Sequence, residues 1–142
     1  MNKRCKNKTN PQKVAKGWLN ISEDVHWLEG WVKSGYGWCA TWFADKHRLT
    51  ENSCGSNLIV IDIDGDTTLA RFWATDTART WCIATYTSSS HTEQEHRFRA
   101  LFSLGRELKS VSEHRGAYWL VVNRLLADLQ LDSLKDKCGQ KP

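Results

Sequence analysis

The chain lacks the features that mark membrane-spanning, secreted and disulfide-rich proteins. No apolar run reaches the length of about 18 residues that a membrane-spanning helix needs, and the N-terminus has no apolar segment typical of a signal peptide. The five cysteines are widely scattered and form no CxxC pair, which disfavours both a zinc site and a disulfide scaffold. We therefore expect a reduced, cytoplasmic protein that does not enter a membrane.

What remains is an ordinary globular composition with a small basic excess. The length of 142 residues suits one domain, and 40% hydrophobic residues suffice for a core. The net charge is +4, and residues 1–17 contain six Lys/Arg and no acid. We predict a basic N-terminal arm over 1–17 and one catalytic domain over 18–142. Such an arm fits a nucleic-acid partner, although solvated charge alone explains it about as well.

Hydrophobic periodicity predicts an α/β (α+β) domain, in which helices flank a mixed β-sheet. The expected strands are 38–44, the very apolar segment LIVIDID at 58–64, 82–87 and 97–104. The expected helices begin at Ser22 and end near Gly35, run over 66–81 with Asp66 or Thr67 as N-cap, and run over 110–131. Residues 45–57 are expected to form a polar loop.

Two aspartates end the most apolar strand. Side chains alternate along a strand, so Asp62 and Asp64 share one face, about 7 Å apart, while Ile61 and Ile63 point into the core. Two such carboxylates repel each other unless a cation lies between them, and hard oxygen ligands suit Mg²⁺ or Mn²⁺. The alternative is a strand that runs out into an acidic helix cap.

A phosphatase of the haloacid dehalogenase type also carries a strand that ends D-x-D-G-T. Here Asp66 is inserted, so the threonine is displaced by one residue. That fold further requires a downstream lysine and a second acidic pair, and Lys109 and the 135–136 Lys-Asp pair lie in unsuitable contexts. We keep this metal-dependent phosphatase as the weakest alternative.

The second informative stretch is SSSHTEQEHRFR at 88–99. Small hydroxyl residues ahead of His91 allow backbone N–H groups and hydroxyls to approach a phosphate, and the histidine can donate to it. Arg97 and Arg99 share one strand face and can neutralise phosphate charge. The other histidines, His96 and His114, show no partner pattern and are expected at the surface.

With both segments, the chain resembles the catalytic domain of archaeo-eukaryotic primases, in particular the primase-polymerases of plasmid and phage replication proteins. The resemblance covers residues 18–142 and rests on LIVIDID, on SSSH followed by HRFRALF, and on LKDKCGQKP after the long helix. It implies a primase-type, RRM-like catalytic core. The third motif lies close to the last residue, so we expect a domain shortened at its C-terminus.

The resemblance implies nucleotidyl transfer to a 3′-hydroxyl by a two-metal mechanism. Asp62 and Asp64 would be metal ligands for Mg²⁺ or Mn²⁺, and Asp136 would be the third, with Asp132 close enough to compete for that role. The implied partners are single-stranded DNA template and primer, nucleoside triphosphates and a replicative helicase.

The resemblance also implies the residues that contact the incoming nucleotide: Ser88, Ser90 and His91 at the triphosphate, with Arg48 and Arg99 as further contacts. A different class of function stays open, namely a non-catalytic nucleic-acid-binding remnant of a replication protein. The basic arm and the eight tryptophans suit that alternative, because aromatic side chains stack on single-stranded bases.

Overall fold

The computed structural model of the protein describes residues 26–34 and 37–134. The chain divides into two compact units, Met1–Ser56 and Asn57–Pro142, and each is described by itself. The predicted arm, 1–17, lies outside the described residues, as do the start of the first predicted helix and Asp136. The predicted boundary of the catalytic domain stays a prediction.

The described part of the first unit contains one α-helix, two short 3₁₀ helices and a short strand pair. Helix α2, His26–Lys33, carries the exposed ion pair Glu29–Lys33, one turn apart. Strand β1 is only Trp42–Phe43, shorter than the predicted 38–44, and it pairs with Gly55 and Ser53. The strand ends there because Ala44–Lys46 turns in a 3₁₀ helix in which Asp45 and Lys46 adopt positive φ. A second 3₁₀ helix, Thr50–Asn52, lies within the segment predicted as loop.

The sheet has the strand order β1-β2-β4-β3 and is antiparallel. Strand β2 is Ser53–Asp64, β3 is Cys82–Thr87 and β4 is Arg97–Leu108. The prediction for 82–87 is confirmed, whereas β2 and β4 are longer than predicted. The register of β3 on β4 is regular from Ala84 onward and shifts between Cys82 and Ala84.

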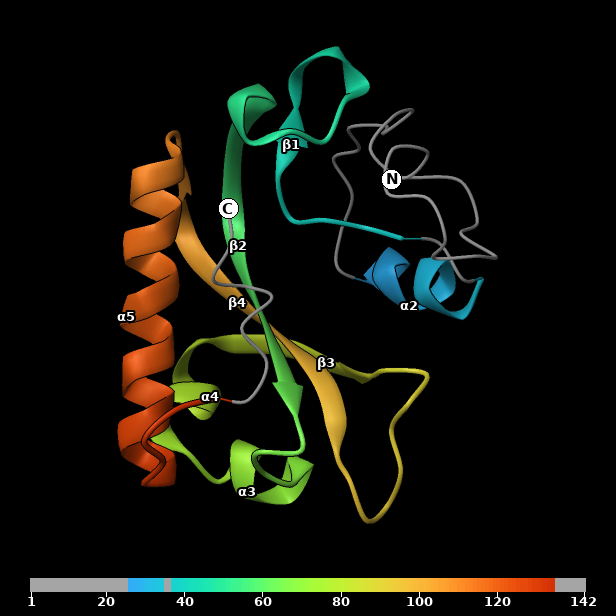
Figure 1. Cartoon of the computed structure of the whole chain (residues 1–142), viewed down its shortest axis with the longest axis vertical. Coiled ribbons are helices and arrows are strands. Elements are labelled where there is room, and N and C mark those ends of the chain that lie inside the picture. The colour runs from blue at the N-terminus through green and yellow to red at the C-terminus, as the bar shows by residue number, and fades with distance from the viewer. Residues whose placement is uncertain (1–25, 35–36, 135–142) are drawn as a thin grey trace. The chain divides into compact units, whose positions relative to one another are not determined.

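One face of the sheet in the second unit is covered by helices. Figure 1 shows α5, Val111–Leu129, along this face, with α3, Leu69–Trp73, and α4, Asp76–Trp81, near one end of α5. Apolar side chains of the strands and helices form the core beneath them: Ile59, Ile61, Ile63, Phe72, Phe98, Phe102, Tyr118, Val121, Val122 and Leu125. Apolar and acidic residues alternate in IDID at 61–64 because the isoleucines face this core and the aspartates face the opposite side of the strand, as predicted.

The predicted helix over 66–81 is wrong in its continuity. The structure has two helices with different caps, Thr68 for α3 and Thr75 for α4, and neither Asp66 nor Thr67 is a cap. The Thr75 hydroxyl donates to the Phe72 carbonyl at 2.7 Å and accepts from the Ala78 N–H at 3.1 Å, which ends one helix and starts the next. Asp128 of α5 then accepts the Thr77 N–H at 2.9 Å.

The long C-terminal helix is confirmed, with bounds slightly inside the predicted 110–131. Ser110 is its N-cap and accepts the Glu113 N–H at 3.1 Å, and Gln130 ends it in the left-handed conformation. None of the helices in the described part of the chain has both the length and the apolar character that crossing a membrane requires. Cys39, Cys54 and Cys82 are free thiols.

Candidate functional site

The second face of the sheet carries the acidic pair. Asp62 and Asp64 project from β2 away from the isoleucine core, and their side chains are 27% and 35% exposed. Arginines of β4 lie opposite them. Arg99 Nε is 2.5 Å from Asp62 Oδ1, and Arg97 Nε is 2.8 Å from Asp64 Oδ1. The step from Asp62 to Asp64 along β2 matches the step from Arg99 back to Arg97 along β4, as expected for two antiparallel strands. We call these four residues the Asp–Arg ladder.

Arg99 has a second partner on the third strand. Tyr86 lies opposite Arg99 in the β3–β4 register, and its hydroxyl accepts from Arg99 Nη1 at 3.0 Å. The guanidinium also lies 5.9 Å from the centre of the Tyr86 ring. Burial by itself lowers the pKa of Arg99, but Tyr86 and Asp62 outweigh that effect and raise the pKa above its ordinary value. Arg99 is therefore held in its charged form.

Arg97 is held by two carboxylates. Its Nη2 donates to Glu95 Oε1 at 2.9 Å, and this bond, more than the charge of Asp64, raises the pKa of Arg97. Arg97 Nε and Asp64 Oδ1 are both buried atoms without a hydrogen bond, although they are close enough to attract as charges. The Nε–H of Arg97 therefore does not point at Asp64 Oδ1. This carboxylate oxygen is buried but accepts no hydrogen bond.

The segment between β3 and β4 is a loop closed by its own hydrogen bonds. The Ser88 N–H donates to the Arg97 carbonyl at 2.9 Å, and the His91 N–H donates to the Ser88 carbonyl at 3.1 Å. The Ser88 and Ser90 hydroxyl oxygens are 3.1 Å apart. Strand β4 begins directly after this loop, so the serines and His91 are tied to the same end of the sheet as Asp64.

The orientation of His91 is set by the backbone of β4. Its Nδ1 accepts the Arg97 N–H at 3.1 Å, so Nδ1 carries no proton and the neutral ring carries it on Nε2. The ring packs edge-to-face on His96, with the centroids 5.0 Å apart. Arg97 thus contacts the His91 ring through its backbone and Asp64 through its side chain, which brings the two sequence motifs together.

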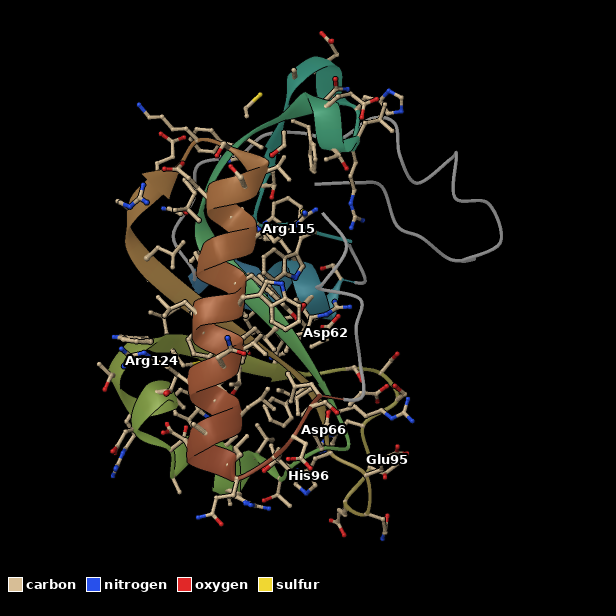
Figure 2. All side chains as sticks on the ribbon, turned by 60° about the vertical axis from the view of Figure 1, so that its left-hand side comes forward. Asp62, Asp66, Glu95, His96, Arg115 and Arg124 are labelled. Carbon is tan, nitrogen blue, oxygen red and sulfur yellow. The ribbon has the colours of Figure 1, made fainter. Side chains whose placement is uncertain are left out.

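The expectation that His96 is a surface residue is wrong. It is half-buried, and its Nδ1 accepts the Leu69 N–H at 3.2 Å, at the start of α3. Its carbonyl accepts the Gly65 N–H at 2.9 Å, which continues the β2–β4 pairing into the turn where Gly65 adopts a φ of 78°. Figure 2 shows Asp66, Glu95 and His96 at this end of the sheet. No local pattern in the sequence indicates the hydrogen bond between Leu69 and His96, because the two residues are 27 positions apart.

His114, also expected at the surface, is half-buried on α5. Its burial lowers its pKa, and a hydrogen bond with the backbone of Leu58 opposes that shift. It belongs to the covered face of the sheet and not to the face of the Asp–Arg ladder.

The structure pairs some of the predicted site residues directly and places others in a neighbouring loop or elsewhere. Arg99 meets Asp62 in the Asp–Arg ladder, which also includes Asp64, whereas Ser88, Ser90 and His91 lie in the loop before β4 and contact the ladder through the backbone of Arg97. Arg48 belongs to the first unit, where it is exposed. The two candidates for the third carboxylate differ: Asp132 is exposed beyond the end of α5, and Asp136 is outside the described residues.

The carboxylates suit a divalent cation in part. Mg²⁺ is commonly held by one or two carboxylates together with substrate phosphates and water, and Asp62 with Asp64 supplies that number. The poorly satisfied Asp64 Oδ1 is an oxygen that a cation would stabilise. Within residues 26–34 and 37–134, however, no group of three His, Cys, Asp or Glu side chains is arranged to hold a metal ion. The described donors therefore fit a cation that arrives with its phosphate ligand.

Comparisons with known proteins add no assignment. No family model, no curated protein and no solved structure matches the chain.

Proposed function

We propose that the face of the Asp–Arg ladder binds a nucleoside triphosphate with Mg²⁺ or Mn²⁺ and transfers the nucleotide to the 3′-hydroxyl of a DNA primer. The observation that carries this proposal is the position of Arg97. Its side chain lies against Asp64 and its backbone N–H donates to His91, so this one residue contacts both the acidic strand and the serine–histidine loop, which supports a shared site. The primase-polymerase resemblance uses these two motifs for that chemistry.

The residues of the chain have distinct roles in this proposal. Asp62 and Asp64 hold the cation, which when bound withdraws charge from the phosphates and lowers the pKa of the primer hydroxyl. His91 donates its Nε2–H to a phosphate oxygen, because its Nδ1 is engaged by the Arg97 backbone. The Ser88 and Ser90 hydroxyls supply further donors.

Other parts of the proposal depend on residues that the site does not include. Asp136 or Asp132 as third metal ligand and Arg48 as a nucleotide or template contact stay predictions. Single-stranded template and primer would bind largely through backbone electrostatics, so their affinity should fall as salt rises. We also propose a cytoplasmic role in plasmid or phage replication, with a replicative helicase as partner.

The test is template-dependent incorporation of nucleotides in Mn²⁺ or Mg²⁺. Asp62→Asn and Asp64→Asn should each lower the rate by at least about a hundredfold, because a cation at the reacting phosphate contributes several kcal/mol to the transition state. The matched control is Asp76→Asn, which removes an exposed carboxylate paired with Arg79 on α4 and should keep the wild-type rate.

A second candidate is non-catalytic binding of single-stranded DNA. The observation that favours it is that arginines already neutralise both aspartates, so no cation is needed to hold them. If the protein binds single-stranded DNA in a salt-dependent way but neither wild type nor variants incorporate nucleotide, this candidate replaces the first. Release of phosphate from a small monoester, lost in Asp62→Asn, would instead support the phosphatase.

A further inference from the structure

The arginines of the Asp–Arg ladder occupy carboxylate oxygens that a cation would need. Arg99 Nε lies on Asp62 Oδ1 and Arg97 Nε lies on Asp64 Oδ1. A guanidinium and a divalent cation repel each other, so both cannot hold the same oxygen at full strength. A cation that binds the aspartates through these Oδ1 atoms would therefore displace the arginines from them.

Each arginine has a second contact that remains when its aspartate is released. Arg99 keeps the Tyr86 hydroxyl and the Tyr86 ring, and Arg97 keeps Glu95. These contacts keep the guanidiniums close to the two aspartates. A guanidinium presents a planar fork of donors that matches phosphate oxygens as well as it matches a carboxylate.

We propose that Arg97 and Arg99 are exchangeable counter-ions that couple metal binding to triphosphate binding. In the free protein they neutralise Asp64 and Asp62, and when a cation takes the carboxylates they pass to the phosphates that arrive with it. The inference rests on the proposed function and adds that binding of the cation and binding of the nucleotide regulate each other. The arginines weaken binding of the cation alone and strengthen binding of the cation with nucleotide, and because coupling is reciprocal the cation must strengthen nucleotide binding equally.

The experiment measures Mn²⁺ binding to the full chain by the electron paramagnetic resonance signal of free Mn²⁺, without DNA. It is done with and without a non-hydrolysable nucleoside triphosphate, with Mn²⁺ binding to the nucleotide itself subtracted. Arg97→Gln and Arg99→Gln are the test variants. Arg106→Gln is the matched control, because Arg106 also lies on β4 and pairs with an exposed carboxylate, Glu113, at 3.3 Å.

Without nucleotide, each test variant should bind Mn²⁺ about threefold to tenfold more tightly than wild type, because a competing cation has been removed. The triphosphate should tighten Mn²⁺ binding by at least about fivefold in wild type and much less in the variants, since the neutral glutamine cannot pair with the phosphates as the arginine would. Arg106→Gln should match wild type in both conditions. Circular dichroism shows which variants are folded, and either test variant alone can decide the result.

The possible failures are distinguishable. If wild type binds Mn²⁺ and the arginine variants bind it equally or more weakly without nucleotide, the exchange is wrong and the proposed function stands. A ladder that only stabilises the sheet would give that result. If wild type binds no more Mn²⁺ than Asp62→Asn, with or without the triphosphate, the proposed metal site itself is wrong and the exchange falls with it.

Discussion

On one face of the sheet in the second unit, Ile59, Ile61 and Ile63 are almost completely buried, and on the other face of the same strand Asp62 and Asp64 stay partly exposed. The two faces therefore serve different ends. The covered face holds the fold together by removing apolar surface from water. The face of the Asp–Arg ladder holds partly exposed ion pairs that contribute little to stability, and we propose that they exchange partners. Stability and chemistry can be changed separately, and three predictions test that separation.

The largest effect is expected on the covered face. Phe72 is fully buried and packs edge-to-face on Phe98 and Phe102, with ring centroids 5.3 and 6.3 Å away. Phe72→Ala should lower the free energy of unfolding by about 3–5 kcal/mol, through lost burial and the cavity left behind. Urea unfolding followed by circular dichroism measures the loss.

The control for this change is its neighbour on the same helix. Trp73 is 36% exposed and donates its Nε1–H to the Thr85 hydroxyl at 3.3 Å. Trp73→Ala should cost about 1–2 kcal/mol, less than Phe72→Ala, because the side chain is already partly exposed and loses one edge contact with Phe72 and one hydrogen bond. An equal loss in the free energy of unfolding for the two variants would contradict the prediction, because it would mean that Trp73 contributes as much to the core as Phe72.

A smaller effect is expected from pH, through His114 on the covered side. Its folded pKa lies below the ordinary value of 6.5, so between those two values the unfolded chain binds more protons than the folded one. The stabilisation is fully present above about pH 6.5 and is lost as pH falls through the folded pKa, with a slope of at most about 1.4 kcal/mol per pH unit.

Urea unfolding between pH 7.5 and 5 measures this slope. His114→Gln should flatten it, since glutamine does not titrate and can still form a hydrogen bond with the Leu58 backbone. The idea fails if the slope is unchanged in the variant, because other groups would then carry the titration.

The smallest effect on stability is expected on the face of the Asp–Arg ladder. Asp62→Asn removes the charge partner of Arg99, but the arginine side chain is 44% exposed and keeps Tyr86. The free energy of unfolding should change by less than about 1 kcal/mol, although the same variant should lower the rate of nucleotide incorporation by at least about a hundredfold. A loss above about 3 kcal/mol would contradict the contrast between the faces, since that cost is typical of breaking a buried ion pair.

The elements that were predicted best are those whose pattern is local. The β-branched and aromatic run at 82–87 and the amphipathic helix after Ser110 were both found, because alternation and helical spacing are visible within a few residues. The helix at 66–81 was predicted as one piece, since its apolar spacing continues through the break. Thr75 divides it by bonding both ways, and Asp128, 51 residues from Thr77, fixes the second half.

The candidate site follows the same division. The shared face of Asp62 and Asp64 and the phosphate-type loop at His91 could be proposed from the sequence, because strand alternation and residue type suffice for both. The partners of the aspartates could not be assigned, since Arg99 lies 37 residues from Asp62 and meets it only through the register of β2 on β4. His96 was misplaced for the same reason.

The sequence by itself determined which side of each strand is apolar and where charge is placed, because these depend on the period of two along an extended backbone. Only the tertiary structure decided that the two carboxylates face arginines, that the backbone of Arg97 holds His91, and that one long helix is two. Those outcomes depend on which strands and helices become neighbours, and the free energy of long-range packing sets that choice, which no local pattern records.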